Sequence, residues 1–193
     1  HAHQRRLVHR DVKAGNLLIT PEGRTKLTDL GLAAYSTESN INGENGENGG
    51  VRPKVRRGRM NIVGTPDYIA PESILTPTDV RPVSDIYSLA CTFYYALTGK
   101  VPFPGGQSKD KLRRHLDQAP ITPFRFASGL NEELVDLLAT MMEKRPERRM
   151  QSAQAVLDGL QPWVVDDAAT RASLGAIVQA TPREGRGSKA DGG

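Results

Sequence analysis

The sequence of 193 residues contains a single cysteine and no long run of apolar residues. A single cysteine excludes an internal disulfide, and the position of Cys91 in an apolar helical pattern predicts a buried, unreactive thiol. The apolar runs are far shorter than the roughly 20 residues that span a bilayer, and no basic-then-apolar leader is recognisable. We therefore expect a cytoplasmic protein, or the cytoplasmic part of a membrane-anchored one, with no membrane contact in this sequence.

Aromatic residues are also scarce, at 5% of the sequence, and leave few side chains on which nucleic-acid bases could stack. The net charge of +4 has the sign expected of a nucleic-acid-binding protein. However, the densest basic cluster, Arg52 to Arg59, contains no interleaved aromatic residue. We therefore expect no nucleic acid among the partners. The hydrophobic content of 37% is sufficient for the core of one domain, or of part of a larger one.

Residues 36–59 interrupt the apolar pattern. The stretch from Ser36 to Gly50 is almost free of apolar residues and contains the near-repeat Asn42 to Gly49. Such a segment buries too little apolar surface to offset the entropy of ordering itself, and we predict a disordered insert. No strand precedes its glycines and no helix follows them, so they do not indicate a phosphate-binding loop. Residues 164–193 are small, polar and glycine-rich, which predicts a low-complexity tail or linker.

Chemically active side chains gather in the string His9-Arg10-Asp11-Val12-Lys13-Ala14-Gly15-Asn16, and a further carboxylate follows at Asp29. Phosphoryl transfer requires a base that orients the attacking hydroxyl, oxygen ligands for Mg²⁺ and a cation near the migrating charge. The string and Asp29 supply all three. Each of these residues alone is most often an ordinary solvated loop residue, so the hypothesis rests on the joint pattern.

The string resembles the catalytic loop of protein kinases. The resemblance implies that Asp11 is the catalytic base and that Lys13 is the cation at the transferred phosphate. It implies that Asn16 is a ligand of one Mg²⁺ and that Asp29 is the principal Mg²⁺ ligand. His9 is then structural and packs against the residue that follows Asp29. The implied cofactors are ATP and Mg²⁺, with Mn²⁺ as a substitute.

Two short β-type runs, Leu17 to Ile19 and Thr25 to Thr28, flank a turn that contains proline and glycine. We predict a β-hairpin that places Asn16 at one end and Asp29 at the other, which brings the two oxygen ligands together. By the resemblance, Leu18 lies under the adenine ring. Packing of Leu18 in the core is an alternative that is compatible with this role.

The stretch from Ile62 to Glu72 resembles the end of the kinase activation segment, which Ala70-Pro71-Glu72 closes. In that family the hydroxyl of Thr65 reaches toward Asp11 and Lys13, and the loop after it receives the substrate backbone. Thr65 and Lys13 together favour Ser/Thr kinases over tyrosine kinases.

The same resemblance gives Glu72 a distant arginine as partner. Arg149 matches that position best, and Arg148 is the alternative. Two charges buried together require close, bidentate geometry, because otherwise the desolvation cost dominates. We therefore expect a structural ion pair between Glu72 and one of these arginines.

Arg10 precedes the base, and in such kinases it commonly receives a phosphate from the activation loop. Residues 40–64 contain no Ser, Thr or Tyr, so the usual acceptor position is empty. The nearest upstream candidates are Ser36, Thr37 and Ser39. Our hypothesis is that the loop is ordered without phosphorylation at the usual place.

Apolar residues at helical spacing predict a core helix over Ile86 to Leu97 that ends at Gly99. The string from Asp85 to Leu89 resembles the central helix of the kinase large lobe, in which the leading Asp85 accepts hydrogen bonds from the catalytic-loop backbone. An ordinary N-terminal cap by Ser84 or Asp85 is the alternative. Further helices are predicted over Lys109 to Leu116, Leu134 to Met142 and Val156 to Leu160.

These features predict an α+β, mainly α fold that resembles the large lobe of a protein kinase, with a small β-hairpin beside the catalytic loop and the small lobe absent. Residues 1–163 would form the C-terminal lobe of the catalytic domain. Tyr87 stands where many eukaryotic kinases carry Trp, which favours the bacterial, eukaryotic-like Ser/Thr kinases. The implied reaction transfers the γ-phosphoryl group of ATP to Ser or Thr hydroxyls of protein substrates. No glycine-rich loop or ATP-pairing lysine precedes the catalytic loop, so we expect an inactive fragment.

Two other classes of function are compatible with parts of this pattern. A pseudokinase or docking module would bind partners without catalysis, but the intact set Asp11, Lys13, Asn16 and Asp29 disfavours it. A small-molecule phosphotransferase with kinase-like loops is disfavoured by the stretch from Gly64 to Glu72, which shapes a surface for protein substrates.

Overall fold

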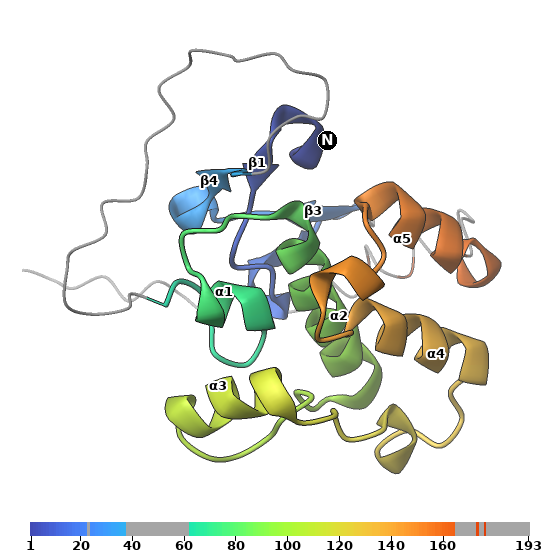
Figure 1. The fold of residues 1–193 in the computed structure, drawn as a ribbon. Coiled ribbons are helices and arrows are strands. Elements are labelled where there is room, and N and C mark those ends of the chain that lie inside the picture. Colours follow the sequence, from blue (N-terminus) through green and yellow to red (C-terminus); the bar gives the residue numbers. More distant parts are fainter. Residues whose placement is uncertain (23, 38–61, 165–172, 174–175, 177–193) are drawn as a thin grey trace, which may run out of the picture.

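The computed structural model describes residues 1–22, 24–37, 62–164, 173 and 176. As predicted, the fold of these residues is mainly helical (Figure 1). The α-helices are α1 (Pro71–Leu75), α2 (Pro82–Thr98), α3 (Ser108–Asp117), α4 (Glu132–Met141) and α5 (Ala153–Leu160). Short 3₁₀ helices are η1 (His3–Arg5), η2 (Ala14–Asn16), η3 (Leu30–Leu32), η4 (Pro123–Arg125), η5 (Pro146–Arg148) and η6 (Gln161–Trp163).

Two small antiparallel sheets lie in the N-terminal part of the chain. Strand β1 (Leu7–Val8) pairs with β4 (Ala34–Tyr35), and β2 (Leu17–Ile19) pairs with β3 (Thr25–Leu27). The register of the second sheet sets Leu17 opposite Leu27. This pairing confirms the predicted hairpin. The prediction succeeded because strands of a hairpin are close in sequence and leave a local signal.

The residue types at its two ends explain where helix α2 begins and ends. Pro82 occupies the first helical position, where its missing N–H costs nothing. Gly99 follows the last turn in the left-handed conformation, with φ of 66°, and its N–H donates to the Tyr95 carbonyl at 2.8 Å. The predicted glycine stop is confirmed. The alternative of a cap by Ser84 or Asp85 is wrong, because both residues lie inside the helix.

The hydrophobic core forms around α2, which runs through the centre of the molecule with α4 and α5 on one side and α1 and α3 on the other (Figure 1). Its buried residues are Ala70, Ile86, Tyr87, Ala90, Cys91, Tyr94, Leu138, Met141, Met142 and Val156. The Cys91 thiol is fully buried, and burial raises its pKa well above the ordinary value, as its position in the helical pattern predicted. In the described part of the chain, no helix combines the length and the apolar character required to cross a membrane.

The predicted insert over residues 36–59 falls mostly outside the described residues, but its first two residues are described. The Ser36 N–H donates to the Arg6 carbonyl at 2.7 Å, and the Thr37 N–H donates to the Val80 carbonyl at 2.9 Å. Of the predicted tail, the structure describes only residues 164, 173 and 176. The prediction of disorder is wrong for Ser36 and Thr37, because their partners are distant in sequence and leave no local signal.

Candidate active site

The side chains of Lys13 and Thr65, which are distant in sequence, meet at the Asp11 carboxylate. Lys13 Nζ donates to Asp11 Oδ2 at 2.6 Å and to Thr65 Oγ1 at 2.8 Å. The Thr65 hydroxyl donates to Asp11 Oδ1 at 2.7 Å, and the Thr65 N–H reaches the same oxygen at 3.2 Å. Both oxygens of the carboxylate thus accept hydrogen bonds, and its orientation is fixed. Sequence reasoning expected the Thr65 hydroxyl beside Asp11 and Lys13, and the structure places it there.

The environment of Asp11 favours its charged form. The residue is only 7% exposed, and burial by itself raises the pKa of a carboxyl group. The hydrogen bonds from Lys13 and Thr65, the Lys13 charge and a hydrogen bond from Asn16 outweigh burial, so the pKa of Asp11 lies below its ordinary value. At neutral pH the group is therefore a carboxylate that can accept a hydrogen bond from a hydroxyl.

Asn16 and Asp29 lie at the end of the β2–β3 hairpin that is nearest to Asp11. Asn16 Nδ2 donates to the Asp11 carbonyl at 2.8 Å and to Asp11 Oδ2 at 3.2 Å, which fixes the amide and leaves its Oδ1 for another partner. The N–H and hydroxyl of Thr28 both donate to the Asn16 carbonyl, at 2.9 and 3.1 Å. Asp29 follows Thr28 in the left-handed conformation, with φ of 64°, and is exposed. The Asn16 and Thr28 backbones thus meet, which places Asp29 beside Asn16 along the fold, and the binding of one metal ion by both side chains stays a prediction.

The donor set fits a magnesium ion that is shared with substrate phosphates. Mg²⁺ usually binds through one or two carboxylates and fills its remaining positions with water and phosphate oxygens. Asp29 offers an exposed carboxylate and Asn16 an amide oxygen. Among the described residues, no group of three or more His, Cys, Asp and Glu side chains forms a self-contained cage. A divalent cation bound by Asn16 and Asp29 would take its remaining ligands from water or from phosphate oxygens.

Asp85 in the first turn of α2 holds the backbone of the catalytic-loop string. Its Oδ2 accepts from the His9 N–H at 2.8 Å, and its Oδ1 accepts from the Arg10 N–H at 2.8 Å. His3 Nε2 also lies 2.8 Å from Oδ2. Sequence reasoning missed this role of His3, because its partner lies 82 residues away and no local pattern marks the pair. Asp85 is 6% exposed, and its carboxylate therefore attaches the backbone of the string to helix α2 by buried hydrogen bonds.

The His9 ring connects this string to the hairpin. Its Nε2 lies 2.9 Å from the Thr28 carbonyl, and its Nδ1 lies 3.3 Å from the Asp11 N–H. Sequence reasoning expected packing against Leu30. Leu30 is 58% exposed, and its packing against the His9 ring stays a prediction. His9 thus joins the two segments that carry Asp11 and Asp29.

The backbone next to Asp11 adopts unusual conformations on both contacting segments. Arg10 is left-handed, with φ of 67°, and Gly64 has φ of 115°, which side chains disfavour. Gly64 was not singled out from the sequence, because a required positive φ depends on the tertiary fold. Arg10 is half-buried, its Nη2 donates to the Pro77 carbonyl at 3.4 Å, and burial lowers its pKa. Its binding of a phosphate stays a prediction.

Glu72 and Arg149 form a buried bidentate ion pair. Arg149 Nη1 donates to Glu72 Oε1 at 2.6 Å, and Nη2 donates to Oε2 at 2.7 Å. The Ser84 hydroxyl also donates to Oε1, at 2.7 Å. Arg149 is 4% exposed, whereas the alternative partner Arg148 is exposed. The pair ties the end of the activation-segment stretch to the turn before α5.

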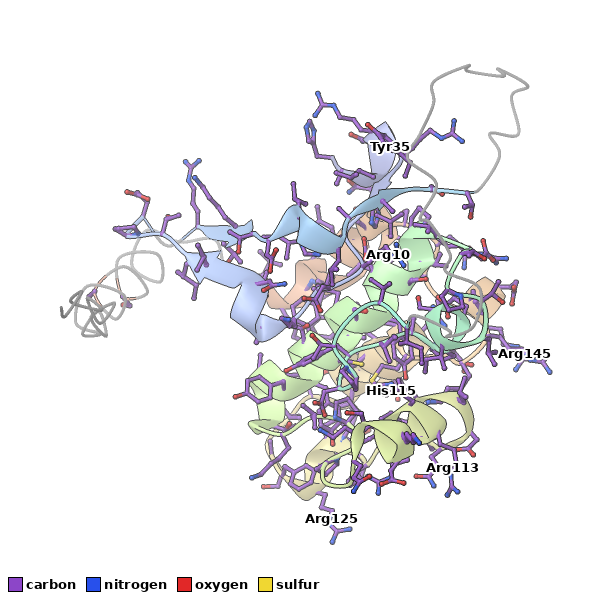
Figure 2. All side chains as sticks on the ribbon, turned by 90° about the vertical axis from the view of Figure 1, so that its left-hand side faces the viewer. Arg10, Tyr35, Arg113, His115, Arg125 and Arg145 are labelled. Atoms are coloured by element: carbon purple, nitrogen blue, oxygen red, sulfur yellow. The ribbon has the colours of Figure 1, made fainter. Side chains whose placement is uncertain are left out.

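An apolar surface extends from the hairpin. Leu18 is 56% exposed, so the alternative that it packs in the core is wrong, and its contact with adenine stays a prediction. The other exposed apolar side chains of this surface are Ile19, Leu27, Leu30, Leu32 and Tyr35. Figure 2 shows Tyr35 near the top of the view, with α3 near the bottom. These six side chains, here called the hairpin surface, come from the β2–β3 hairpin and from the segments η3 and β4 that follow it.

The comparisons with known proteins agree with this geometry. The model of the protein kinase domain matches residues 1–163. A probable serine/threonine-protein kinase of Clostridium perfringens is 32% identical over 176 residues, which is 91% of this chain and 23% of the relative. The serine/threonine-protein kinase PknA of Mycobacterium tuberculosis is 34% identical over 159 residues, 82% of this chain and 32% of PknA. The serine/threonine-protein kinase PknB of the same species is 31% identical over 153 residues, 79% of this chain and 22% of PknB.

The chain thus spans between a fifth and a third of the length of these relatives. The matched family covers the catalytic-loop string, the hairpin, the stretch around Thr65 and all five α-helices. On this evidence, the chain belongs to the protein kinase family.

Proposed function

We propose that residues 1–163 are the C-terminal lobe of a Ser/Thr protein kinase of the bacterial, eukaryotic-like type. The reaction is transfer of the γ-phosphoryl group of ATP to Ser or Thr hydroxyls of protein substrates. The observation that carries the proposal is the closed set of hydrogen bonds among Asp11, Lys13 and Thr65. The Ser/Thr kinase names of the relatives support the same reaction.

The side chains around Asp11 have distinct tasks in this reaction. The Asp11 carboxylate orients the substrate hydroxyl and accepts its proton. The Lys13 ammonium places a positive charge where the migrating phosphoryl group develops negative charge. Thr65 holds both groups in one orientation through its hydroxyl. Asn16 and Asp29 would hold a Mg²⁺ ion, which would neutralise phosphate charge when bound.

The hairpin surface supports the second part of the proposal, that a small lobe covers it in the active enzyme. Its six exposed apolar side chains lie on the hairpin and on the segments that follow it, and gathered apolar side chains that stay exposed often mark a surface that another domain or a ligand covers. The 193-residue sequence contains no glycine-rich loop or ATP-pairing lysine before His9. We therefore expect the chain alone to transfer no phosphate, and a longer natural protein that contains it together with a small lobe to do so.

The test compares two Asp→Asn substitutions in the natural protein that contains this sequence. Asp11→Asn removes the proposed base, and we expect the transfer of radiolabel from ATP to casein, or to the kinase itself, to fall at least 100-fold. Asp117→Asn makes the same change at a 56%-exposed residue of α3, and should leave the rate within about twofold. Equal rates for Asp11→Asn and the unchanged protein would contradict the proposed reaction.

The same substitution separates the kinase from a pseudokinase or docking module. A module that only binds partners would retain its cellular function after Asp11→Asn, because the substitution preserves the size of the side chain. The kinase would lose its function. Radiolabel found on small molecules but on no protein would instead favour a small-molecule phosphotransferase.

A further inference from the structure

The side chain of Lys111 connects helix α3 to the stretch that follows Thr65. Its Nζ donates to Asp67 Oδ2 at 2.9 Å and lies 2.7 Å from Asp67 Oδ1. Both side chains are only 22% exposed, so salt and water screen this ion pair less than a pair on the open surface. Asp67 Oδ1 is buried and, although it lies close to the ammonium, accepts no hydrogen bond from any described residue. The Lys111 charge therefore compensates this oxygen.

A short turn joins Asp67 to the candidate active site. The Tyr68 N–H donates to the Thr65 carbonyl at 3.0 Å, which closes a turn over residues 65–68, here called the Thr65 turn. The ring of Pro66 fixes φ in the range that the second residue of such a turn requires. The Thr65 hydroxyl in turn donates to Asp11 Oδ1 at 2.7 Å. Only one residue separates Asp67 from Thr65, so a displacement of Asp67 also moves the hydroxyl beside the Asp11 carboxylate.

Helix α3 is itself fixed to the core one helical turn beyond Lys111. His115 follows Lys111 by four residues and therefore lies on the same face of the helix. It is 0% exposed, and its ring packs edge-on against Phe103, with ring centroids 4.7 Å apart. Its Nδ1 lies 2.9 Å from the Tyr87 hydroxyl oxygen, and Lys144 Nζ donates to its carbonyl at 2.9 Å. Figure 2 shows His115 on the side of α3 that faces the rest of the protein. Lys111 thus extends toward the Thr65 turn from a helix that is held in place.

We infer that Lys111 is a positioning residue, which holds the Thr65 turn through Asp67 in the place that a protein substrate requires for binding. The inference rests on the proposed function, because that function assigns the stretch after Thr65 to the substrate. Lys111 acts through Asp67, to which its ammonium donates. Without this ammonium, the partly buried Asp67 carboxylate would move toward water, and the turn would move with it.

The first experiment measures amide hydrogen exchange in the natural protein that contains this sequence. Lys111→Met removes the charge and keeps an unbranched side chain of good helix propensity. We expect exchange of the Tyr68 amide, whose hydrogen bond closes the turn, to rise about tenfold, because the turn opens more often. Amides of α4 should keep their exchange rates. Lys109→Met makes the same change at an exposed residue of α3 and should alter neither set of amides.

Two results of this experiment would overturn the inference. One is a Tyr68 amide that exchanges equally fast in Lys111→Met and in the unchanged protein, and the other is a rise of the same size in Lys109→Met. If Lys111→Met does not fold, Asp67→Asn provides a second test, because it removes the opposite charge. Exchange at Tyr68 should then rise about threefold, since an amide oxygen binds an ammonium less strongly than a carboxylate does. An unchanged rate in Asp67→Asn would also overturn the inference.

The second experiment measures steady-state kinetics with casein and ATP. For Lys111→Met we expect KM for casein to rise about fivefold, while KM for ATP stays within about twofold, because the turn is assigned to the protein substrate. Lys111→Arg keeps the cation and should return KM for casein to within about twofold of the original. The double substitution Lys111→Met with Asp67→Asn leaves neither charge in place, and should recover at least half of the rise in KM.

The double substitution separates positioning from direct contact with the substrate. If KM for casein is equally high in Lys111→Met and in the double variant, Lys111 contacts the substrate itself and the inference is overturned. A KM for casein that does not change in Lys111→Met would contradict it as well. A natural protein that transfers no phosphate to casein would refute the proposed function instead. In that case the exchange of the Tyr68 amide would still decide whether Lys111 holds the turn.

Discussion

A β-carbon placed on Gly64 would lie 2.9 Å from the backbone oxygen of Arg10, closer than side-chain carbons normally approach. Gly64 also has φ of 115°, a conformation that other residues rarely adopt. Its neighbour Thr65 bonds to Asp11, which follows Arg10. The close approach of these two backbones therefore determines how near the Thr65 hydroxyl lies to the carboxylate.

Gly64→Ala should destabilise the protein by about 1–3 kcal/mol, because it combines an unfavourable φ with a steric clash against backbone. It should also lower phosphoryl transfer, since Thr65 must move away from Asp11. Urea unfolding and the casein assay measure the two effects. Gly129→Ala is the matched control, because a β-carbon there meets no atom within 4 Å. Gly64→Ala with the stability and activity of that control would show that the backbones separate freely.

Local signals accounted for most of the helices and for the hairpin. Gly99 ends α2 because the left-handed position follows directly from the residue type, and Asn131 caps α4 by accepting from the Leu134 N–H at 3.0 Å. The expected pairs of Glu72 with Arg149 and of Thr65 with Asp11 came from family resemblance, since spacing along the chain does not determine which distant residues meet. The resemblance supplied contacts that periodicity could not.

The ion pair between Glu72 and Arg149 yields a prediction about stability. Arg149→Met leaves the Glu72 carboxylate buried without its cation, and we expect a loss of about 3–5 kcal/mol in the free energy of unfolding. The double substitution Glu72→Met with Arg149→Met should recover part of that loss, because no charge then remains buried. Urea unfolding of the three variants measures the coupling between the two residues.

Arg148→Met is the control for this pair. Arg148 is exposed and directly precedes Arg149, so its substitution should change the free energy of unfolding by less than about 0.5 kcal/mol. If Arg148→Met and Arg149→Met lower the free energy of unfolding equally, the buried ion pair between Glu72 and Arg149 does not stabilise the protein.

The residues that sequence reasoning missed share one physical property. His3, Gly64 and His115 all act through contacts with residues more than 25 positions away or through a backbone conformation that the fold imposes. On α3 His115 lies among charged residues, and only the tertiary structure shows that it is directed toward Tyr87. An isolated polar residue produces no periodic pattern in the sequence, so its structural role becomes visible only in the folded structure.

Acid should weaken the fold through His115. Its pKa is lowered to about 4 in the folded protein, against about 6.5 in an unfolded chain. Between these values the unfolded state binds more protons, so the free energy of unfolding rises with pH. The stabilisation is fully present above pH 6.5 and is lost progressively as pH falls toward 4, by up to about 3 kcal/mol.

Urea unfolding at a series of pH values from 4 to 7 measures this slope. His115→Gln cannot titrate in that range, and its free energy of unfolding should depend less on pH by the same amount. The charged groups facing His115, Lys144 and Asp67, remain in both proteins and serve as an internal control. Parallel pH profiles for the two proteins would show that His115 does not titrate on unfolding.

Thr37 yields a prediction about regulation. Its hydroxyl donates to Asp79 Oδ1 at 2.9 Å and accepts from the Val80 N–H at 3.0 Å. Burial acts to raise the pKa of Asp79, but hydrogen bonds from Arg81 and Thr37 outweigh it, so the carboxyl is ionised at neutral pH. A phosphate on Thr37 would remove the donated hydrogen and add negative charge beside this carboxylate. The described conformation is thus that of an unphosphorylated Thr37.

We therefore expect the active natural protein to require no phosphate at Ser36, Thr37 or Ser39. Phosphatase treatment should leave its casein kinase activity within about twofold, and mass spectrometry should find these three residues unmodified in the active fraction. Thr37→Ser keeps the hydroxyl and should behave like the unchanged protein, whereas Thr37→Glu introduces a charge beside Asp79 and should lower activity. The prediction is contradicted if dephosphorylation abolishes the activity and a phosphate is mapped to any of the three residues. The active loop would then require phosphorylation.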